Sequence, residues 1–394
     1  MSNFEYIAGH QLVSRRTVLA ASLLGAASPA LGVTRRDDSL DQFIKEQLHS
    51  ASIPGMAVGT AKAGKVSLVR AYGFADVARR RHITTGSVFH LASVTKTVTA
   101  TAVMLLVETG QVDLDAPVNR YLDFTVVNPA HPDVAITVRH LLTHVSGISD
   151  HTYYQVDFRT IGKDSQLSLR TFLTNYLTPG GAHYSATGCF SSAAPGAAYD
   201  YCNVGYALLG YIVERIAHED LGLFTQKRIF RPLGMQAIAW RIADVPPQLA
   251  VTPYDVIDGR TVATQPVGFP DFPVGMLRAS IAGFMPFVAA AANSGATDRA
   301  RILTAANQAE MLTMTVPPGL PPWVSGQGLG WMESTSDGKR RINHWGGDPG
   351  VFTAVYLAPA TQTGVAIFTN MSATPESKKS IKRIAEHLLT DTMP

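Results

Sequence analysis

Two pairs of β-rich segments, one near each end of the chain, constrain the fold most strongly. Residues 55–62 and 66–76 are separated by a short turn and predict an N-terminal hairpin. Residues 350–357 and 363–370 predict a second hairpin near the C-terminus. The segments between the two hairpins have mainly helical patterns. We therefore expect an α+β fold in which both chain ends build one antiparallel sheet, flanked by helices, with a mainly helical lobe inserted.

Length and composition are typical of a large globular fold. The chain has 394 residues, of which 46% are hydrophobic and only 16% are charged, so a sizeable core is expected. Within a domain spanning 31–394, we expect 31–92 and 325–394 to form an α/β lobe and 93–324 to form the mainly helical lobe. The formal net charge is +3 and the sequence has no dense run of lysine and arginine, which predicts no nucleic-acid partner.

Residues 1–30 have the pattern of a twin-arginine export signal. Arg15 and Arg16 precede the mildly apolar residues 20–30, and cleavage is expected after Ala30. This apolar run is too short to span a bilayer, and no cysteine follows it for a lipid anchor. The pattern predicts a periplasmic or secreted protein that has no membrane anchor after the signal is removed.

The chain contains two cysteines, Cys189 and Cys202. In an oxidising compartment they could form a disulfide that closes a short loop. The required Cα and Cβ geometry cannot be deduced from their spacing. The sequence therefore leaves the disulfide and two free thiols equally open.

A serine and a lysine begin a long apolar stretch in the first half of the chain. Ser93 and Lys96 precede a Val-, Ala-, Leu- and Thr-rich run that ends near Gly110, which predicts a buried helix beginning near Ser93. Residues three apart share a helix face, so the two side chains are expected to meet. Desolvation lowers the pKa of a buried ammonium, which makes such a lysine a base for a serine nucleophile.

A structural interpretation of the same two residues is also open. Ser93 could be a helix N-cap, and Lys96 could extend its amine from the helix to solvent. However, burying a charged residue within an apolar, threonine-rich helix costs free energy, and a catalytic role would explain why the lysine is there. This favours the catalytic interpretation.

Two further motifs contain residues suited to acyl-transfer chemistry. Tyr201 and Asn203 directly precede an apolar helical pattern, and a tyrosine held near a lysine can exchange protons with substrate. His344-Trp345-Gly346-Gly347 precedes the C-terminal hairpin, and its glycines would allow a substrate close to the backbone. We expect these four residues to bind or orient the substrate.

The pair His140 and His144 has the i, i+4 spacing of some metal sites. No glutamate occupies the position that a metalloprotease would need, and the sequence offers no obvious third ligand. We therefore expect both histidines to be structural, and we expect no metal and no cofactor.

The order of these motifs resembles that of the serine β-lactamase-related hydrolases, which include class C β-lactamases, DD-peptidases, D-aminopeptidases and family VIII-type esterases. The resemblance covers nearly all of the chain after residue 30. The motifs that carry it are Ser93-x-x-Lys96, Leu141-Leu142-Thr143-His144-x-Ser146-Gly147, Tyr201-x-Asn203, Pro232-Leu233-Gly234-Met235 and His344-x-Gly346-Gly347. It implies a β-lactamase/transpeptidase-like fold.

The resemblance also implies a role for each matched residue. Ser93 would be the acylated nucleophile, and Lys96 and Tyr201 would share the proton transfers. Asn203 would orient Lys96 or the substrate. The backbone N–H groups of Ser93 and Gly347 would bind the oxyanion.

One motif departs from the family pattern. His344-Trp345-Gly346 stands where β-lactamases carry Lys-Thr-Gly, whose lysine supplies a cation for the β-lactam carboxylate. An unperturbed histidine is mostly neutral at pH 7, and Trp345 adds apolar bulk. With the aromatic pair Tyr153 and Tyr154, Trp345 is expected to line the substrate pocket.

These observations predict a serine hydrolase that forms an acyl-enzyme with a small-molecule ester, β-lactam or D-amino-acid peptide. Esterase or peptidase-like activity is favoured. The alternative is a penicillin-binding type of receptor that is acylated without efficient hydrolysis. An α/β-hydrolase is disfavoured because the sequence has no Gly-x-Ser-x-Gly motif.

Overall fold

The computed structural model describes residues 33–336 and 338–391. The predicted export signal lies outside this range and stays a prediction. Internal contacts divide the chain into residues 1–43 and 44–394. Of the first unit, the structure describes only the start of helix α1 (Val33–Ser50), which continues into the second unit. Among the described residues, no helix combines the length and the apolar character needed to cross a membrane.

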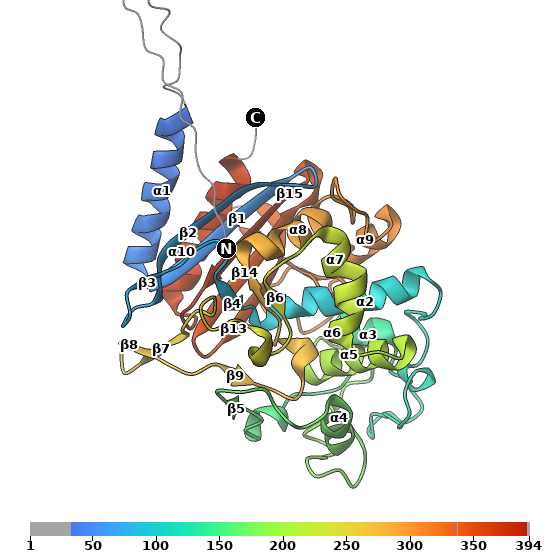
Figure 1. Cartoon of the computed structure of the whole chain (residues 1–394). Helices are drawn as coiled ribbons and strands as arrows, with labels where there is room; N and C mark the ends of the chain where they lie inside the picture. The colour runs from blue at the N-terminus through green and yellow to red at the C-terminus, as the bar shows by residue number, and fades with distance from the viewer. Residues whose placement is uncertain (1–32, 337, 392–394) are drawn as a thin grey trace, which may run out of the picture. The chain divides into compact units, whose positions relative to one another are not determined.

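The centre of the second unit is an eight-stranded antiparallel sheet with the strand order β11-β12-β13-β14-β15-β1-β2-β3 (Figure 1). The N-terminal strand β1 pairs with the C-terminal strand β15, with Met56 opposite Thr369. The predicted α+β sheet, built from both chain ends, is therefore confirmed. Its strands are β1 (Gly55–Lys62), β2 (Lys65–Asp76), β3 (Arg81–His82), β11 (Gly326–Gln327), β12 (Met332–Ser336), β13 (Lys339–Asp348), β14 (Val351–Ala358) and β15 (Thr363–Thr369).

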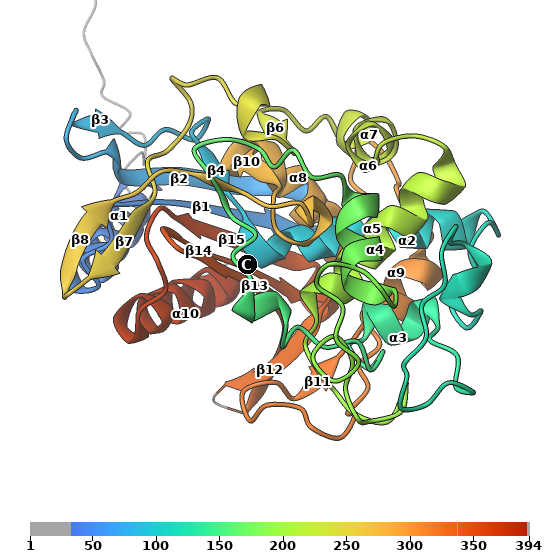
Figure 2. The ribbon, with the colours of Figure 1, turned by 90° about the horizontal axis from the view of Figure 1, so that it is seen from below.

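Helices α8 (Ile281–Ala292) and α10 (Pro375–Asp391) cover the sheet, which lies between them in Figure 2. Strands β14 and β15 are buried along almost their whole length because both of their faces are covered. The glycine at position 59 lets α8 approach closely, since a Cβ atom there would overlap Met285. Although α8 falls within 93–324, the range predicted for the helical lobe, it packs on the sheet.

Within the inserted segment, helices α2 and α5 pack on each other, and α3, α4 and α6 pack on α5. Helix α2 is buried on nearly all sides. Three of its threonines, Thr97, Thr99 and Thr101, donate their hydroxyl hydrogens to backbone carbonyls, as Thr101 Oγ1 does to Thr97 O at 2.8 Å. The inserted helices are α2 (Thr95–Glu108), α3 (Val138–Leu142), α4 (Leu169–Leu177), α5 (Asn203–Ala217), α6 (Leu221–Thr225), α7 (Arg231–Leu233) and α9 (Ala305–Met311).

Three short sheets lie outside the main one. The first, in the order β4-β10-β6, leads the chain into the Ser93 region through β4. The strands of the three sheets are β4 (Val88–His90), β6 (Ile238–Ala239) and β10 (Arg278–Ser280), then β5 (Thr160–Ile161) with β9 (Val267–Gly268), then β7 (Tyr254–Ile257) with β8 (Arg260–Ala263).

Candidate active site

Ser93 lies in a short 3₁₀ turn, Ala92–Val94, between strand β4 and helix α2. The turn is fixed from two sides: Leu91 N–H donates to Leu277 O at 2.9 Å, and Thr353 Oγ1 donates to Leu91 O at 2.7 Å. Ala92 has a left-handed φ of 45°, a costly conformation for a residue with a Cβ atom. Helix α2 begins at Thr95, and its N-cap residue is Val94 rather than Ser93. The structure therefore does not support the N-cap interpretation.

Lys96 is fully buried beside Ser93. Its Nζ donates to Ser93 Oγ at 3.1 Å, to Asn203 Oδ1 at 2.9 Å and to Val274 O at 3.1 Å. Burial lowers the pKa of Lys96 to about 8, although nearby carboxylates oppose the shift. About a tenth of the Lys96 amines are then neutral at pH 7. The alternative in which Lys96 reaches solvent is wrong, because none of the residue is exposed.

Asn203 is held at the N-terminus of α5 by a carboxylate that the sequence analysis missed. Asp150 accepts hydrogen bonds from the N–H groups of Asn203 at 2.6 Å and Val204 at 3.1 Å. The Asn203 amide is oriented by donating from Nδ2 to Tyr154 at 3.1 Å. Its Oδ1 therefore faces Lys96. Asp150 lies far from Asn203 in the sequence, and no local motif marks it.

Tyr201 lies over the Ser93–Lys96 pair. The neighbouring Ser93 side chain acts to lower the pKa of Tyr201, and Lys96 Nζ lies 5.0 Å from the Tyr201 ring centroid. The ring stacks on His144, with centroids 4.3 Å apart. Burial raises the pKa of Tyr201, so the side chain stays a phenol at neutral pH.

The surroundings of His144 indicate a structural role. It is buried, its Nδ1 accepts a hydrogen bond from Cys202 N–H at 3.1 Å, and its ring packs against Tyr201. Across 33–336 and 338–391, no group of three or more His, Cys, Asp or Glu side chains could hold a metal ion. The pair His140 and His144 therefore does not form the core of a metal site in the described part of the chain.

The four residues of the C-terminal motif lie on β13 and have different surroundings. Gly346 lets the strand approach the Ser93 turn, since a Cβ atom would lie 3.0 Å from Ser93 N and would overlap Leu91 O. The next residue, Gly347, lines the cavity beside Ser93. His344 is buried, and burial lowers its pKa to about 3.

The cavity next to Ser93 has a volume of about 500 Å³ and combines aromatic, aliphatic and acidic side chains. It is lined by Ser93, Tyr153, Tyr154, Gln155, Val156, Asp157, Phe158, Arg159, Tyr201, Asn203, Phe269, Asp271, Val274, Gly275, Met276, Gly347, Asp348 and Pro349.

The predictions for Trp345 and His344 need correction. Neither residue lines this cavity. Trp345 instead donates from Nε1 to Tyr356 at 3.0 Å, because alternate residues of a strand point to opposite faces and Gly346 occupies the face toward Ser93. His344 Nδ1 bonds to the carbonyl of Trp345 at 2.9 Å. Tyr153 and Tyr154, in contrast, line the cavity as expected.

The two cysteines are free thiols with separate partners. Cys189 Sγ donates to His183 O at 3.2 Å. Cys202 caps α5 by accepting from Gly205 N–H at 3.2 Å, and it donates to Asp150 at 3.2 Å. The structure therefore favours free thiols over the disulfide.

Gly346 and Gly347 offer a matched pair of substitutions. We expect Gly346→Ala to lower the free energy of unfolding by about 1–3 kcal/mol, because the added methyl group overlaps Leu91 O. A Cβ atom at Gly347 would meet nothing within 4 Å, so Gly347→Ala should leave the melting temperature unchanged. Thermal unfolding of both variants checks this; equal melting temperatures would contradict the close approach of β13 to the Ser93 turn.

A family model provides the decisive comparison with known proteins. The model described as Beta-lactamase matches residues 40–389, which is most of the chain. The chain belongs to the beta-lactamase family. The resemblance drawn from the five sequence motifs is thus confirmed.

Curated relatives of this beta-lactamase family chain have different names. Esterase EstB of Burkholderia gladioli is 31% identical over 238 residues, covering 59% of this chain and 56% of its own. Protein flp of Staphylococcus aureus is 22% identical over 353 residues, covering 89% of this chain and 65% of its own. The chain thus spans less than two thirds of the length of either relative.

Solved structures share the fold of this family member. D-amino acid amidase from Ochrobactrum anthropi SV3, complexed with D-phenylalanine, superposes with a TM-score of 0.71 at 21% identity, covering 90% of this chain and 99% of its own. EstCE1, described as a hydrolase with promiscuous acyltransferase activity, also has a TM-score of 0.71, at 20% identity and with the same two coverages. At this level of identity these structures confirm the β-lactamase/transpeptidase-like fold alone.

Proposed function

We propose that this protein is a serine hydrolase that forms a covalent acyl-enzyme on Ser93 and acts on esters or amides. The observation that carries the proposal is the 3.1 Å contact between Lys96 Nζ and Ser93 Oγ in a site where Lys96 is fully buried. A buried lysine with a pKa of about 8 can accept a proton from serine near neutral pH.

The reaction proceeds in two acyl transfers. Neutral Lys96 takes the Ser93 proton as Oγ attacks the substrate carbonyl carbon, and the N–H groups of Ser93 and Gly347 stabilise the oxyanion. As the bond to the leaving group breaks, Tyr201 delivers a proton to that group and is reprotonated from Lys96. Water then attacks the Ser93 ester and gives its proton to the Lys96–Tyr201 pair. The pair returns this proton to Ser93 Oγ as the acyl bond breaks and the acid is released, which restores neutral Lys96 and the Ser93 hydroxyl.

The cavity chemistry favours neutral or cationic esters and amides over β-lactams, which carry a carboxylate. His344 is buried and uncharged at neutral pH, so it supplies no cation at the position where β-lactamases carry lysine. The cavity wall also contains Asp271 and Asp348, which in their ionised forms would repel an anionic substrate. The names of Esterase EstB and D-amino acid amidase agree with ester and amide substrates.

Comparing two chromogenic substrates tests the proposal. We expect kcat/KM for p-nitrophenyl butyrate to exceed that for a chromogenic cephalosporin by about tenfold or more. A faster cephalosporin would contradict the substrate assignment. A stable cephalosporin adduct formed without turnover of either compound would favour the receptor alternative.

A further inference from the structure

Two carboxylates on the cavity wall form no ion pair with a lysine or arginine among residues 33–336 and 338–391. Asp271 is only 2% exposed, and its Oδ2 accepts a hydrogen bond from the Tyr153 hydroxyl at 3.0 Å. Its buried Oδ1 has no hydrogen-bond partner among the described residues. Because a buried, unpaired carboxylate oxygen is costly, Asp271 needs a partner that the described part of the chain does not supply.

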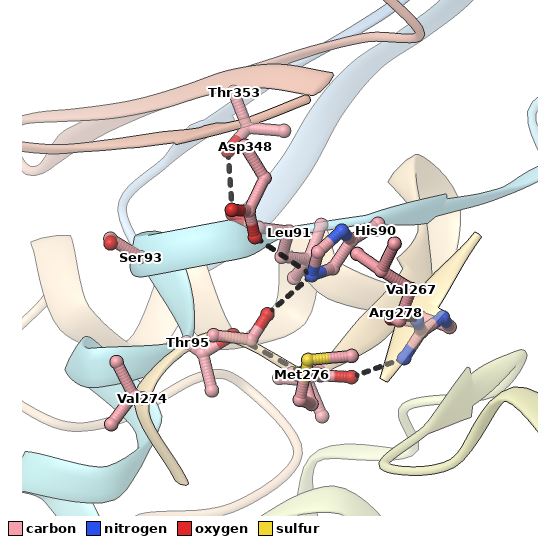
Figure 3. A network of polar contacts seen from close by, with 12 residues as sticks. His90, Leu91, Ser93, Thr95, Val267, Val274, Met276, Arg278, Asp348 and Thr353 are labelled. Atoms are coloured by element: carbon pink, nitrogen blue, oxygen red, sulfur yellow. Dashed lines mark hydrogen bonds and ion pairs between the residues drawn. The ribbon is translucent and has the colours of Figure 1, made fainter. Parts of the chain in front are cut away.

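Asp348 lies at the end of β13, directly after Gly347, and its side chain is 24% exposed. Its Oδ2 lies 3.7 Å from Nε2 of His90 (Figure 3). The same Nε2 bonds to Gly275 O at 2.7 Å, and since a carbonyl only accepts, Nε2 carries the hydrogen. Burial lowers the pKa of His90 to about 3, so His90 is neutral and gives Asp348 no opposite charge.

The cationic side chains nearby direct their hydrogen bonds elsewhere. Lys96, Arg278 and Arg159 lower the pKa of Asp348 through space, and Lys96 also lowers that of Asp271, but burial outweighs these effects. Arg159 forms a two-point ion pair with Asp157, at 2.8 and 2.9 Å. Arg278 donates to the carbonyls of Met276 at 2.8 Å and Val267 at 3.1 Å, and in Figure 3 it lies beyond His90 from Asp348. In the described part of the chain, neither Asp271 nor Asp348 forms an ion pair with lysine or arginine.

The electrostatics of the two carboxylates agree with this geometry. Burial raises the pKa of Asp271 to about 6 and that of Asp348 to about 7, and repulsion from Asp271 adds to the rise for Asp348. A cation bound between the cavity walls would favour the ionised form of both groups. Aromatic side chains of the same cavity, including Tyr153 and Phe158, would also attract a cation.

We propose that Asp271 and Asp348 form an ammonium-binding subsite, so that the preferred substrate is an ester or amide carrying a positively charged ammonium group. This inference rests on the proposed acyl-serine function and names its substrate class. The ammonium group belongs either to the acyl part or to the leaving group. Both positions place a cation in the cavity next to Ser93, and the experiment below distinguishes them.

The test uses two substrate pairs that differ only in charge. For the acyl side, ε-aminocaproic acid methyl ester is compared with methyl heptanoate, in which a methyl group replaces the ammonium group. For the leaving-group side, butyrylcholine is compared with its neutral analogue in which carbon replaces the nitrogen. We expect the charged member of one pair to have a kcat/KM about tenfold or more above the neutral member. The pair that shows the preference identifies the side that carries the ammonium group.

The variants Asp348→Asn and Asp271→Asn should each reduce this charged-to-neutral ratio by about tenfold or more, because each removes one negative charge. Asp133→Asn, at an exposed aspartate that does not line the cavity, is the matched control and should keep the wild-type ratio. Circular dichroism and melting temperature establish that each variant folds, and either aspartate variant alone is sufficient for the test.

A ratio near one for both pairs in the wild type overturns the ammonium subsite, as does a preference that neither aspartate variant lowers. These results differ from a failure of the proposed function. If the wild type hydrolyses none of the four esters and no p-nitrophenyl butyrate, acyl-serine hydrolysis itself is wrong. If it hydrolyses the neutral esters without a preference for charge, only the subsite is wrong.

Discussion

Replacing Ser93 by alanine is expected to lower kcat for p-nitrophenyl butyrate by at least about 10⁴-fold, because the side chain that forms the acyl-enzyme is lost. The fold should be retained, since the backbone contacts of the turn at Leu91 do not depend on the Ser93 hydroxyl. Stopped-flow or steady-state release of p-nitrophenol measures the effect.

The matched control for this variant is Ser87→Ala. Ser87 is also buried, but it accepts a hydrogen bond from Thr84 N–H at 3.0 Å and does not line the cavity. Its substitution should leave kcat within about threefold of the wild type, because it touches no group of the site. Turnover retained by Ser93→Ala would remove Ser93 from the nucleophile's position.

The second large effect is expected at Lys96. Lys96→Met removes the amine that receives the Ser93 proton, and we expect kcat/KM to fall by about 10²–10⁴-fold. Lys96→Arg should fall to a similar extent, because an arginine keeps its charge and cannot act as a base near neutral pH. Activity retained by the arginine variant would show that only the positive charge at this position matters.

The pH dependence of the wild type tests the same role of Lys96. The base must be neutral in the free enzyme, and the neutral fraction increases as pH rises toward the pKa of about 8. We therefore expect kcat/KM for a neutral ester to rise with pH up to about 8 and then to level off. A profile that is flat between pH 6 and 9 would contradict Lys96 as the base. A lysine with a pKa of about 8 changes from mostly charged to mostly neutral across this range.

The sequence predicted those parts of the site that depend on local patterns. The contact between Ser93 and Lys96 follows from helical spacing, and the sheet built from both chain ends follows from two alternating, turn-bounded hairpins. Tyr201 and Asn203 were found because they lie at the start of α5, which begins at Asn203. In each case the relevant contact is set by short-range geometry or by a motif of adjacent residues.

The parts that the sequence did not predict depend on long-range placement. Asp150 reaches the N-terminus of α5 from a distant loop, and Asp271 reaches the cavity from the segment before β10. The orientation of Trp345 was predicted incorrectly because it depends on the register of β13, in which Gly346 pairs with Thr353. A shift of one residue in a strand reverses the face of every side chain, and the motif alone does not define that register.

The central claim is that Ser93 becomes acylated, and mass analysis of the enzyme during turnover tests it most directly. The protein is mixed with p-nitrophenyl butyrate, quenched in acid within one turnover and digested for peptide mapping. Our account predicts a butyryl adduct on the peptide that contains Ser93, and no such adduct in Ser93→Ala. Release of p-nitrophenol with the butyryl group on a different residue, or release that persists in Ser93→Ala, would contradict it.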